Sequence, residues 1–470
     1  MFSEDHNRYY LLQQHQRRSC LIDKKTLLIL ICVILPVTLF CTTYMILFGI
    51  YEKLSYPKSS IYGFNSDEMI HKNVHRAVLY SNYKYSQNYS DIPDNSYLDE
   101  HSINEFKLIC YYNFPSDSND LQVKDIDPFL CTHINVAFGT VQNNSIYLDS
   151  DQIGYLRNIT KLKEVNKQLK ILLSIGGSGN GNGYPEMVKN HTNRKMFIQS
   201  ILSYVKLYNL DGIDLDWEFP VQYPNGDKKQ KMHFTQLLIE IRENIARQKK
   251  YAYLLTLAVA ATSTIADMSY DVSYINDYVD YINLMSYDYH FYTSLTPFTG
   301  INAPLYSGSN EKYYMATLNI NYSSHYWNFM GMDKSKIVIG LPTYGHSYRL
   351  RNARNHDIYA PASGYGKLGT YGFASYTEIC NFLQTNHITP VFDMENFSPY
   401  ASKYYEWISF EDEQSLTYKA EFIKNHNFGG AMVYCLNTDD YTGICKMGKN
   451  GGSNFPLIKT IKNVLGDKEL

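Results

Sequence analysis

The chain has 470 residues, a formal net charge of −3, and 44% hydrophobic against 19% charged residues. This apolar content is enough to bury a large core, so the composition excludes a globally disordered chain. A nucleic-acid-binding protein would carry a basic excess, and this charge balance predicts no nucleic-acid partner. The length fits two or three average domains, or one α/β barrel with insertions.

Residues 26–51 form an apolar segment without a charged side chain. As a helix, this segment would reach about 39 Å, more than the ~30 Å hydrocarbon core of a bilayer. Lys and Arg are more frequent before it than just after it, which predicts a cytosolic tail over 1–25 and a type II, single-pass membrane protein. The expected element is a retained signal-anchor. A cleaved signal peptide is the alternative, but its apolar region would be shorter.

The segment that follows, residues 52–104, is rich in polar residues and Tyr and has no sustained apolar period. We interpret it as a stalk that carries a lumenal or extracellular domain. Asn-x-Ser/Thr sequons, which mark glycan acceptors in such compartments, agree with this placement because all of them follow the apolar segment. The sequons begin at Asn88, Asn143, Asn158, Asn190, Asn321 and Asn396.

From residue 106 onward, short apolar runs alternate with longer helical stretches. Such strands are typical of a parallel sheet covered on both faces by helices. Eight units favour a closed (β/α)8 TIM barrel over 105–465, whereas the competing open doubly wound sheet usually has fewer. A stretch rich in Tyr and Gly, at about 345–412, predicts a small α+β insertion between strands seven and eight. The expected strands are 106–112, 133–138, 169–175, 211–217, 253–260, 280–286, 336–342 and 429–436.

The strongest chemical signal is the segment DGIDLDWE, which ends at Glu218. Because side chains alternate along a strand, Asp214, Asp216 and Glu218 share one face. Neighbouring carboxyls in a dry core raise one another's pKa. Either a structural hydrogen-bond network or an active site with one protonated carboxyl as general acid would explain them. Their position at the end of a barrel strand favours the active site.

A divalent cation is the rival explanation, because Asp and Glu oxygens bind Mg²⁺ or Ca²⁺. No His-x-x-x-His pair, Cys/His cluster or phosphate-binding loop accompanies these carboxyls in the sequence. The Gly-rich run at 174–179 lacks the Lys-Ser/Thr ending of a P-loop, so we expect its glycines to let the backbone pass close to a ligand or turn tightly. The sequence therefore predicts no metal and no cofactor.

The motif DGIDLDWEFP resembles the DGxDxDWE signature of the glycoside hydrolase family 18 chitinases. The resemblance extends over about 106–465 and follows the order of the family's strands. It implies retaining, substrate-assisted hydrolysis of β-1,4-linked N-acetylglucosamine polymers, with chitin or its oligomers as the ligand. The other matching segments are KLICYYN at 107–113, LCTHINVAF at 130–138, SIGG at 174–177, MSYD at 285–288, TGINAPLY at 299–306, GLPTYG at 340–345 and GGAMVY at 429–434.

The resemblance also implies roles for single residues. Glu218 would protonate the glycosidic oxygen while the substrate's acetamido oxygen attacks the anomeric carbon. Asp216 would stabilise the resulting oxazolinium, and Asp214 would tune Asp216 by sharing a proton. Tyr287 would hydrogen-bond the acetamido group. The implied sugar-binding residues are Tyr111, Met285, Asp288, Tyr344, Met432 and Tyr434, of which Met285, Tyr344 and Met432 would also fit as core residues.

Cysteine pairing follows from the same resemblance. The family's two usual disulfides correspond to Cys110 with Cys131 and Cys380 with Cys445, which fits an oxidising compartment. Cys435 would remain unpaired inside the barrel.

The sequence departs from the family at several positions. Tyr434 stands where the eighth strand normally ends in Trp, which forms the floor beneath the sugar, and His346 replaces an Arg. A smaller ring offers less contact area, so we expect weaker polymer binding or an altered chain-length preference. A weakly active or inactive glycan-binding lectin is therefore the alternative to a chitinase, and a protein-binding scaffold is a third. Because Glu218 is retained, the sequence favours the enzyme.

Overall fold

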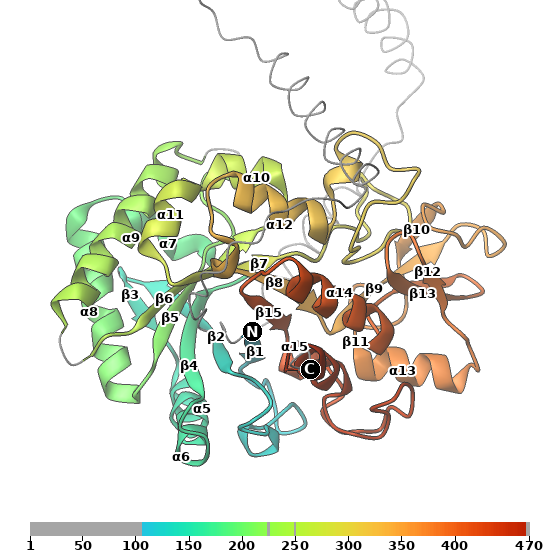
Figure 1. Cartoon of the computed structure of the whole chain (residues 1–470), viewed down its shortest axis with the longest axis horizontal. Coiled ribbons are helices and arrows are strands. Elements are labelled where there is room, and N and C mark those ends of the chain that lie inside the picture. The colour runs from blue at the N-terminus through green and yellow to red at the C-terminus, as the bar shows by residue number, and fades with distance from the viewer. Residues whose placement is uncertain (1–105, 223–225, 249–250, 467–470) are drawn as a thin grey trace, which may run out of the picture. The chain divides into compact units, whose positions relative to one another are not determined.

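The structure is a computed structural model that describes residues 106–222, 226–248 and 251–466. Eight parallel strands pair in the order β1-β15-β8-β7-β6-β5-β4-β2, and the pairing of β1 with β2 closes the barrel (Figure 1). Each expected strand is present with similar bounds. The barrel strands are β1 Lys107–Asn113, β2 His133–Gln142, β4 Lys170–Gly176, β5 Gly212–Asp216, β6 Leu254–Ala260, β7 Tyr281–Met285, β8 Ile337–Pro342 and β15 Gly430–Tyr434.

Alternating side chains on these strands build two cores, as the pleat requires. Outward side chains, such as Ile213 and Leu215 of β5, pack with the covering helices in the larger cluster. Inward side chains form a second, separate cluster along the barrel axis. Its buried members are Ile109, Tyr111, Ala137, Tyr281, Val338, Met432 and Cys435.

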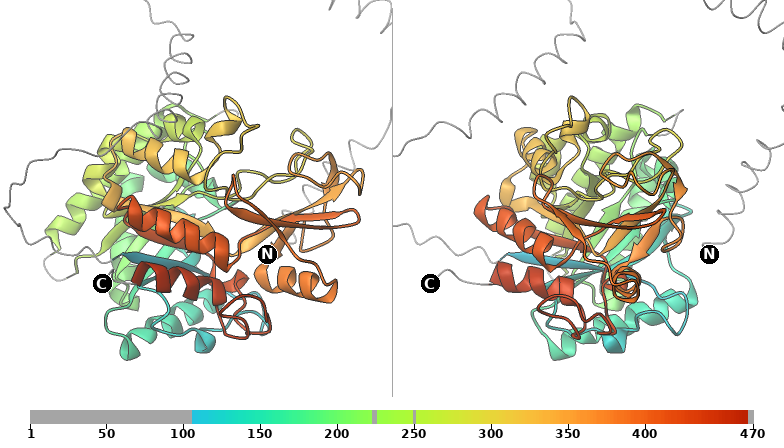
Figure 2. Two further views of the ribbon diagram at one scale, coloured as in Figure 1. Left: turned by 45° about the vertical axis from the view of Figure 1, so that its right-hand side comes forward. Right: turned by 90° about the vertical axis from the view of Figure 1, so that its right-hand side faces the viewer.

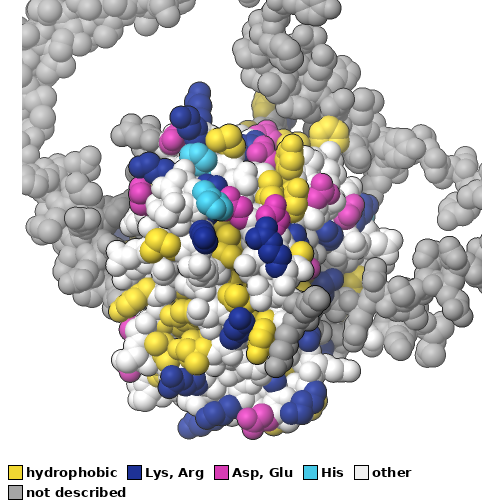
Figure 3. All heavy atoms as spheres, turned by 90° about the vertical axis from the view of Figure 1, so that its left-hand side faces the viewer, with side chains coloured by type: hydrophobic (Ala, Val, Ile, Leu, Met, Phe, Trp, Pro, Cys, Tyr) yellow, Lys and Arg dark blue, Asp and Glu magenta, His cyan; other side chains and the backbone are white. Residues whose placement is uncertain are grey.

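The helices surround the barrel, and those on the side of α8 and α9 expose interspersed acidic and basic side chains (Figure 3). Several helices begin at side-chain caps, as in α5, where Asp149 and Gln152 form a capping box. The α-helices are α5 Ser150–Thr160, α6 Leu162–Val165, α7 Tyr184–Val188, α8 His191–Tyr208, α9 Lys229–Arg247, α10 Ser263–Ser269, α11 Val272–Tyr278, α12 Ile320–Phe329, α13 Tyr376–Thr385, α14 Glu413–Asn425 and α15 Pro456–Gly466. Short 3₁₀ helices are η3 Val123–Asp125, η4 Gly181–Gly183, η5 Met315–Thr317, η6 Lys334–Lys336 and η7 Leu436–Thr438.

A second, antiparallel sheet lies between β8 and α14, where the sequence predicted an insertion. Its strands pair in the order β10-β9-β14-β13-β12, with β11 also pairing with β9. The sheet lies beside the barrel, and α13 packs near it (Figure 2). Its strands are β9 Tyr344–Leu350, β10 Ala362–Tyr365, β11 Phe373–Ser375, β12 Val391–Asp393, β13 Ser398–Lys403 and β14 Glu406–Ser409.

One strand differs from its expected length. β2 continues to Gln142 and turns back through Asn143 and Asn144 into β3, Ser145–Tyr147. Both turn residues have positive φ, 48° and 59°, which Asn adopts more readily than most residues and which matches the twist of a tight hairpin. The pair Asn-Asn was the local signal for this hairpin.

The predicted type II membrane topology is corrected by the structure. Among the described residues, none of the helices combines the length and the apolar character needed to cross a bilayer. These helices are not apolar all round, because each buries one face on the barrel and turns a polar face to solvent. The 19-residue α9 is an example. The expected cytosolic tail 1–25, signal-anchor 26–51 and stalk 52–104 lie outside the described residues.

The sequons differ in accessibility. Asn143 is exposed at the β2–β3 turn, whereas Asn396 is only 4% exposed. The side-chain Nδ2 of Asn396 donates to the carbonyl oxygen of Tyr306 at 2.9 Å. In the folded chain the side chain of Asn143 is therefore accessible, whereas that of Asn396 is not. The sequon at Asn88 lies outside the described residues.

Candidate active site

Asp214 lies at the centre of the barrel on β5 and is fully buried. Its Oδ2 accepts hydrogen bonds from Tyr111 Oη at 2.6 Å and Ser174 Oγ at 2.7 Å. Its Oδ1 accepts from Thr256 Oγ1 at 2.6 Å and Asn283 Nδ2 at 3.0 Å. These donors come from β1, β4, β6 and β7, so four other strands of the barrel converge on one carboxyl group.

Two donors on each oxygen fill the acceptor positions of a carboxylate. Burial raises the pKa of Asp214, and the four hydrogen bonds oppose that rise. Among the described residues, no hydrogen bond joins Asp214 to Asp216, and the proton sharing that the family resemblance implied stays a prediction. The charge of Asp214 is one of the causes that raise the pKa of Asp216.

Asp216, two residues further along β5, has the opposite environment. It is 3% exposed, and its Oδ1 has no hydrogen-bond partner among the described residues. Burial, followed by the charges of Glu218 and Asp214, raises the pKa of Asp216 well above its ordinary value. A buried polar atom without a partner costs about 1–3 kcal/mol, so such an atom calls for a functional reason.

The approach of β4 to Asp216 depends on glycine. Gly176 ends β4 with φ 108°, and a Cβ there would lie 2.0 Å from the Asp216 carbonyl oxygen. The next residue, Gly177, donates its N–H to that same oxygen at 2.8 Å. Gly176 and Gly177 thus let β4 approach the backbone of Asp216 closely, and the approach to a ligand stays a prediction.

Glu218 follows β5 and completes the carboxyl series. Burial, together with the negative charge of Asp288, raises the pKa of Glu218 to about 7. The carboxyl is therefore protonated through the acidic range and begins to lose its proton near neutrality. This is the property that a general acid needs at working pH.

Asp288 lies beyond β7, and half of its side chain faces solvent. Its Oδ1 accepts from Tyr344 Oη at 2.6 Å and pairs with His346 Nε2 at 2.7 Å, both from β9. Its backbone N–H donates to Asn302 Oδ1 at 2.9 Å, which fixes the left-handed residue, with φ 57°. The second sheet thus supplies two of the contacts that orient Asp288.

Tyrosine rings form the floor beside the carboxyls. The ring centroid of Tyr434, at the end of β15, lies 5.7 Å from Tyr111, 6.0 Å from Tyr287 and 6.2 Å from Tyr344. The Tyr434 hydroxyl accepts from Asn113 Nδ2 at 3.5 Å. Among the described residues, the Tyr287 hydroxyl has one weak hydrogen-bond partner, Met432 Sδ at 3.9 Å.

The remaining sugar-binding residues implied by the resemblance lie deeper. Tyr111, Tyr344 and Met432 are 1%, 2% and 0% exposed, and Met285 is half-buried in the inner cluster. The Tyr111 hydroxyl donates a hydrogen bond to Asp214, and the Tyr344 hydroxyl donates one to Asp288. Tyr111 and Tyr344 are therefore buried and hydrogen-bonded to carboxyl groups, and neither ring is exposed.

Sequence reasoning missed the other ligands of Asp214. Ser174, Thr256 and Asn283 are fully buried polar residues, one on each of three strands. The available signal was a single polar residue inside an otherwise apolar strand, because such a group is found buried only when it has a hydrogen-bond partner.

Disulfides join Cys110 to Cys131 and Cys380 to Cys445, the pairs that the resemblance implied, and Cys435 is buried and free. The described part of the chain holds no group of three or more His, Cys, Asp or Glu residues that could bind a metal ion.

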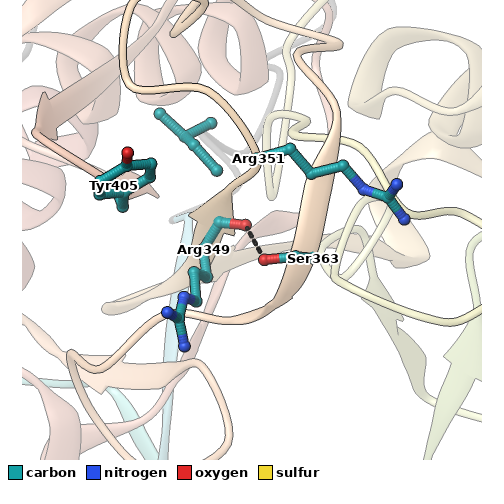
Figure 4. Close-up of a pocket in the computed structure, with 5 residues that line it drawn as sticks. Arg349, Arg351, Ser363 and Tyr405 are labelled. Carbon is teal, nitrogen blue, oxygen red and sulfur yellow. Dashed lines mark hydrogen bonds between the residues drawn. The ribbon is translucent and has the colours of Figure 1, made fainter.

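A cavity of about 470 Å³ lies away from the carboxyls, in the second sheet. Arg349, Arg351, Ser363 and Tyr405 line it, and the two guanidinium groups point in different directions (Figure 4). Ser363 Oγ donates to the Arg349 carbonyl oxygen at 3.2 Å. The charged groups of this cavity point apart, whereas the carboxyls at β5 lie close together. We therefore place the candidate active site at the barrel.

Comparison with known proteins identifies the family of the barrel. The profile of the glycosyl hydrolases family 18 matches residues 107–439. Human chitinase-3-like protein 2 is 37% identical over 376 residues, which are 77% of this chain and 93% of that protein. Two solved structures each align with 77% of this chain and with 100% of their own chain. Human YKL-39, described as a pseudo-chitinase with retained chitooligosaccharide binding, has 35% identity and TM-score 0.72, and the Ostrinia furnacalis Group IV chitinase has 34% and 0.71.

A closed (β/α)8 barrel with polar groups gathered at the carboxyl ends of its strands is the architecture of many enzymes, whose active sites lie at that end. With the profile match over most of the barrel, the chain belongs to the glycosyl hydrolases family 18.

Proposed function

We propose that this chain hydrolyses β-1,4-linked N-acetylglucosamine polymers by substrate-assisted, retaining catalysis, and that residues 105–465 form the catalytic unit. Glu218 protonates the glycosidic oxygen, and the substrate's acetamido oxygen displaces the leaving sugar at the anomeric carbon. Water then opens the oxazolinium, and Glu218 recovers its proton from that water. The bonds broken and formed balance without a protein nucleophile or a cofactor.

The observation that carries this proposal is that the three carboxyls on β5 and just after it have three different environments. Asp214 is satisfied by four donors, Asp216 has a buried oxygen without a partner, and Glu218 has a pKa of about 7. A substrate amide N–H placed against Asp216 would satisfy that oxygen and orient the acetamido group for attack. The weakly bonded Tyr287 hydroxyl supports a role as the second contact to this group.

The test is Glu218→Gln in the full-length chain. Gln keeps the shape and a hydrogen-bonding side chain but cannot donate a proton, so we expect hydrolysis of a chitin hexamer to fall by at least ~10²-fold, the usual contribution of a general acid. Calorimetry should show hexamer binding close to that of the wild type. Cleavage that survives this substitution would remove Glu218 from the proposed role.

A glycan-binding protein with little activity is the second candidate. It is favoured by Tyr434, since this smaller ring stands where the family resemblance implies a Trp floor, and by the likeness to a relative described as a pseudo-chitinase. Product mass spectrometry after incubation with N-acetylglucosamine oligomers separates the two candidates. Unchanged oligomers, bound at micromolar affinity, would favour the binding protein.

A further inference from the structure

A cavity of about 460 Å³ lies at the amino end of the barrel, among α5, α6 and the end of α8. Small-molecule sites commonly have volumes of roughly 300–1,000 Å³, so this cavity can hold a small ligand. Asp211, which lines it, directly precedes β5, whereas Glu218 follows the same strand. The cavity and the candidate active site therefore lie at opposite ends of the barrel.

Basic side chains outnumber acidic ones around this cavity. Among the described residues that line it, the charged ones are Arg157, Lys161, Lys163, Lys167, Glu164 and Asp211. Asp211 is already paired, since its Oδ2 lies 2.7 Å from Lys163 Nζ and its Oδ1 lies 3.6 Å from Lys170 Nζ. Three basic side chains and Glu164 therefore set the charge that the cavity presents to a ligand.

These three basic side chains have no carboxylate partner. Among the described residues, Arg157, Lys161 and Lys167 form no ion pair, and Lys161 Nζ donates to the neutral Asn158 Oδ1 at 3.0 Å. The guanidinium carbon of Arg157 lies 5.8 Å from the centre of the Tyr208 ring. A guanidinium that stacks on a ring keeps its N–H donors at its edge, where an anion can accept from them.

The helix ends beside the cavity are satisfied by other donors. The carbonyl oxygen of Asn209, the C-cap of α8, accepts from Lys163 Nζ at 2.5 Å. At the end of α5, Thr160 Oγ1 donates to the Arg157 carbonyl oxygen at 3.0 Å. Carbonyl groups at a helix C-terminus attract cations, so these donors reduce the competition for Arg157, Lys161 and Lys167.

One side of the cavity is apolar. Leu207, near the end of α8, is 70% exposed, and it lies next to Tyr208 in the lining. An exposed Leu beside several cations suits a ligand in which a small apolar body carries an anionic group.

We propose that this cavity binds a phosphate or sulfate group, alone or on a small organic ligand. A tetrahedral oxyanion accepts several charge-assisted hydrogen bonds at once, and Arg157, Lys161 and Lys167 supply donors from three positions around the cavity. Phosphate and sulfate share this geometry, so the arrangement defines the class of ligand. The site uses no residue assigned to hydrolysis and does not depend on the proposed function.

The test measures binding of inorganic phosphate, inorganic sulfate and phenyl phosphate to the full-length chain by calorimetry at low ionic strength. Phenyl phosphate should bind more tightly than inorganic phosphate, because its ring can contact Leu207. In Arg157→Gln/Lys167→Gln, affinity for each anion that the wild type binds should fall by at least ~tenfold, since two charge-assisted hydrogen bonds are lost. Both side chains are exposed, so the fold should be retained.

Arg349→Gln/Arg351→Gln is the matched control. It removes the same charge from the cavity of the second sheet, where the two guanidinium groups point apart (Figure 4), and should keep the wild-type affinity. Equal losses in the two variants would mean that net charge alone attracts the anions, which would overturn the site. A wild type that binds none of the three probes, or an unchanged affinity in Arg157→Gln/Lys167→Gln, would overturn it as well.

Discussion

Three carboxyls, two on β5 and one just after it, have different properties. Asp214 accepts hydrogen bonds from four donors, and Asp216 is buried with one oxygen that has no partner among the described residues. Glu218, which follows β5, has a pKa of about 7. The differences come from burial and from which strands lie alongside, since the residue types are nearly the same. The chemistry of the site is therefore a consequence of how far each carboxyl lies along the barrel axis.

The raised pKa of Glu218 predicts the alkaline limb of the pH profile. The acid must be protonated to act, and its pKa lies above the ordinary carboxyl value, so kcat should hold below pH 7 and decline as the pH rises through about 7. Asp288→Asn removes one of the two causes of this rise and should move the limb to lower pH. Measured kcat between pH 4 and 9 checks this, and a limb that does not move would show that burial alone sets the pKa.

Tyr434→Trp tests whether this ring is the sugar floor. Trp offers a larger face, so the dissociation constant for a chitin tetramer should fall about threefold to tenfold, the value of one improved aromatic contact. Tyr434→Phe, which loses the contact with Asn113 but keeps the ring, is the control and should bind like the wild type. Equal affinities for all three proteins would place the sugar elsewhere.

The alternation of residues in DGIDLDWE predicts a shared face for Asp214 and Asp216, which lie on β5, and for Glu218, which follows the strand. It could not predict the four donors to Asp214, because Ser174, Thr256 and Asn283 lie on three other strands and meet only when the barrel closes. For the same reason, the hydrogen bond from Tyr111 to Asp214 was not predictable, and the resemblance implied only a sugar contact for this residue. The roles of these residues toward a substrate remain predictions.

At the scale of elements, the barrel strands were predictable because both of their faces are buried, which leaves long apolar runs. The strands of the second sheet were less visible, since β11 and β12 have three residues each and carry exposed side chains. Their order depends on pairing between distant segments, for example Tyr348 with Trp407, which no local pattern encodes.

A buried ion pair joins the second sheet to α14. Lys419 and Glu411 are both fully buried side chains, and Lys419 Nζ also donates to Ser398 Oγ of β13 at 3.0 Å. Lys419→Met would leave an unpaired buried carboxyl and should lower the free energy of unfolding by about 3–5 kcal/mol. The double variant Lys419→Met/Glu411→Leu should regain most of the lost free energy of unfolding, because it leaves no unpaired charge. Urea denaturation measures both, and a double variant no better than the single one would contradict this account.

At the scale of the whole described unit, two disulfides close loops of different length. Cys110 and Cys131 are 21 residues apart in sequence, whereas Cys380 and Cys445 are 65 apart. The longer loop restricts the unfolded chain more, so replacing both cysteines by Ser should cost roughly 3 kcal/mol for the first pair and roughly 4 kcal/mol for the second. Denaturant unfolding of the two variants tests the order, and a larger loss for the first pair would contradict it.

The bond between Cys380 and Cys445 also has a mechanical consequence. Cys380 lies in α13 of the inserted subdomain, and Cys445 precedes α15, the last described helix. Tension applied behind α15 would peel that helix away and then, at Cys445, pass covalently into α13 instead of unzipping β15 from the barrel. The crosslink thus diverts pulling forces away from the strand that carries Tyr434.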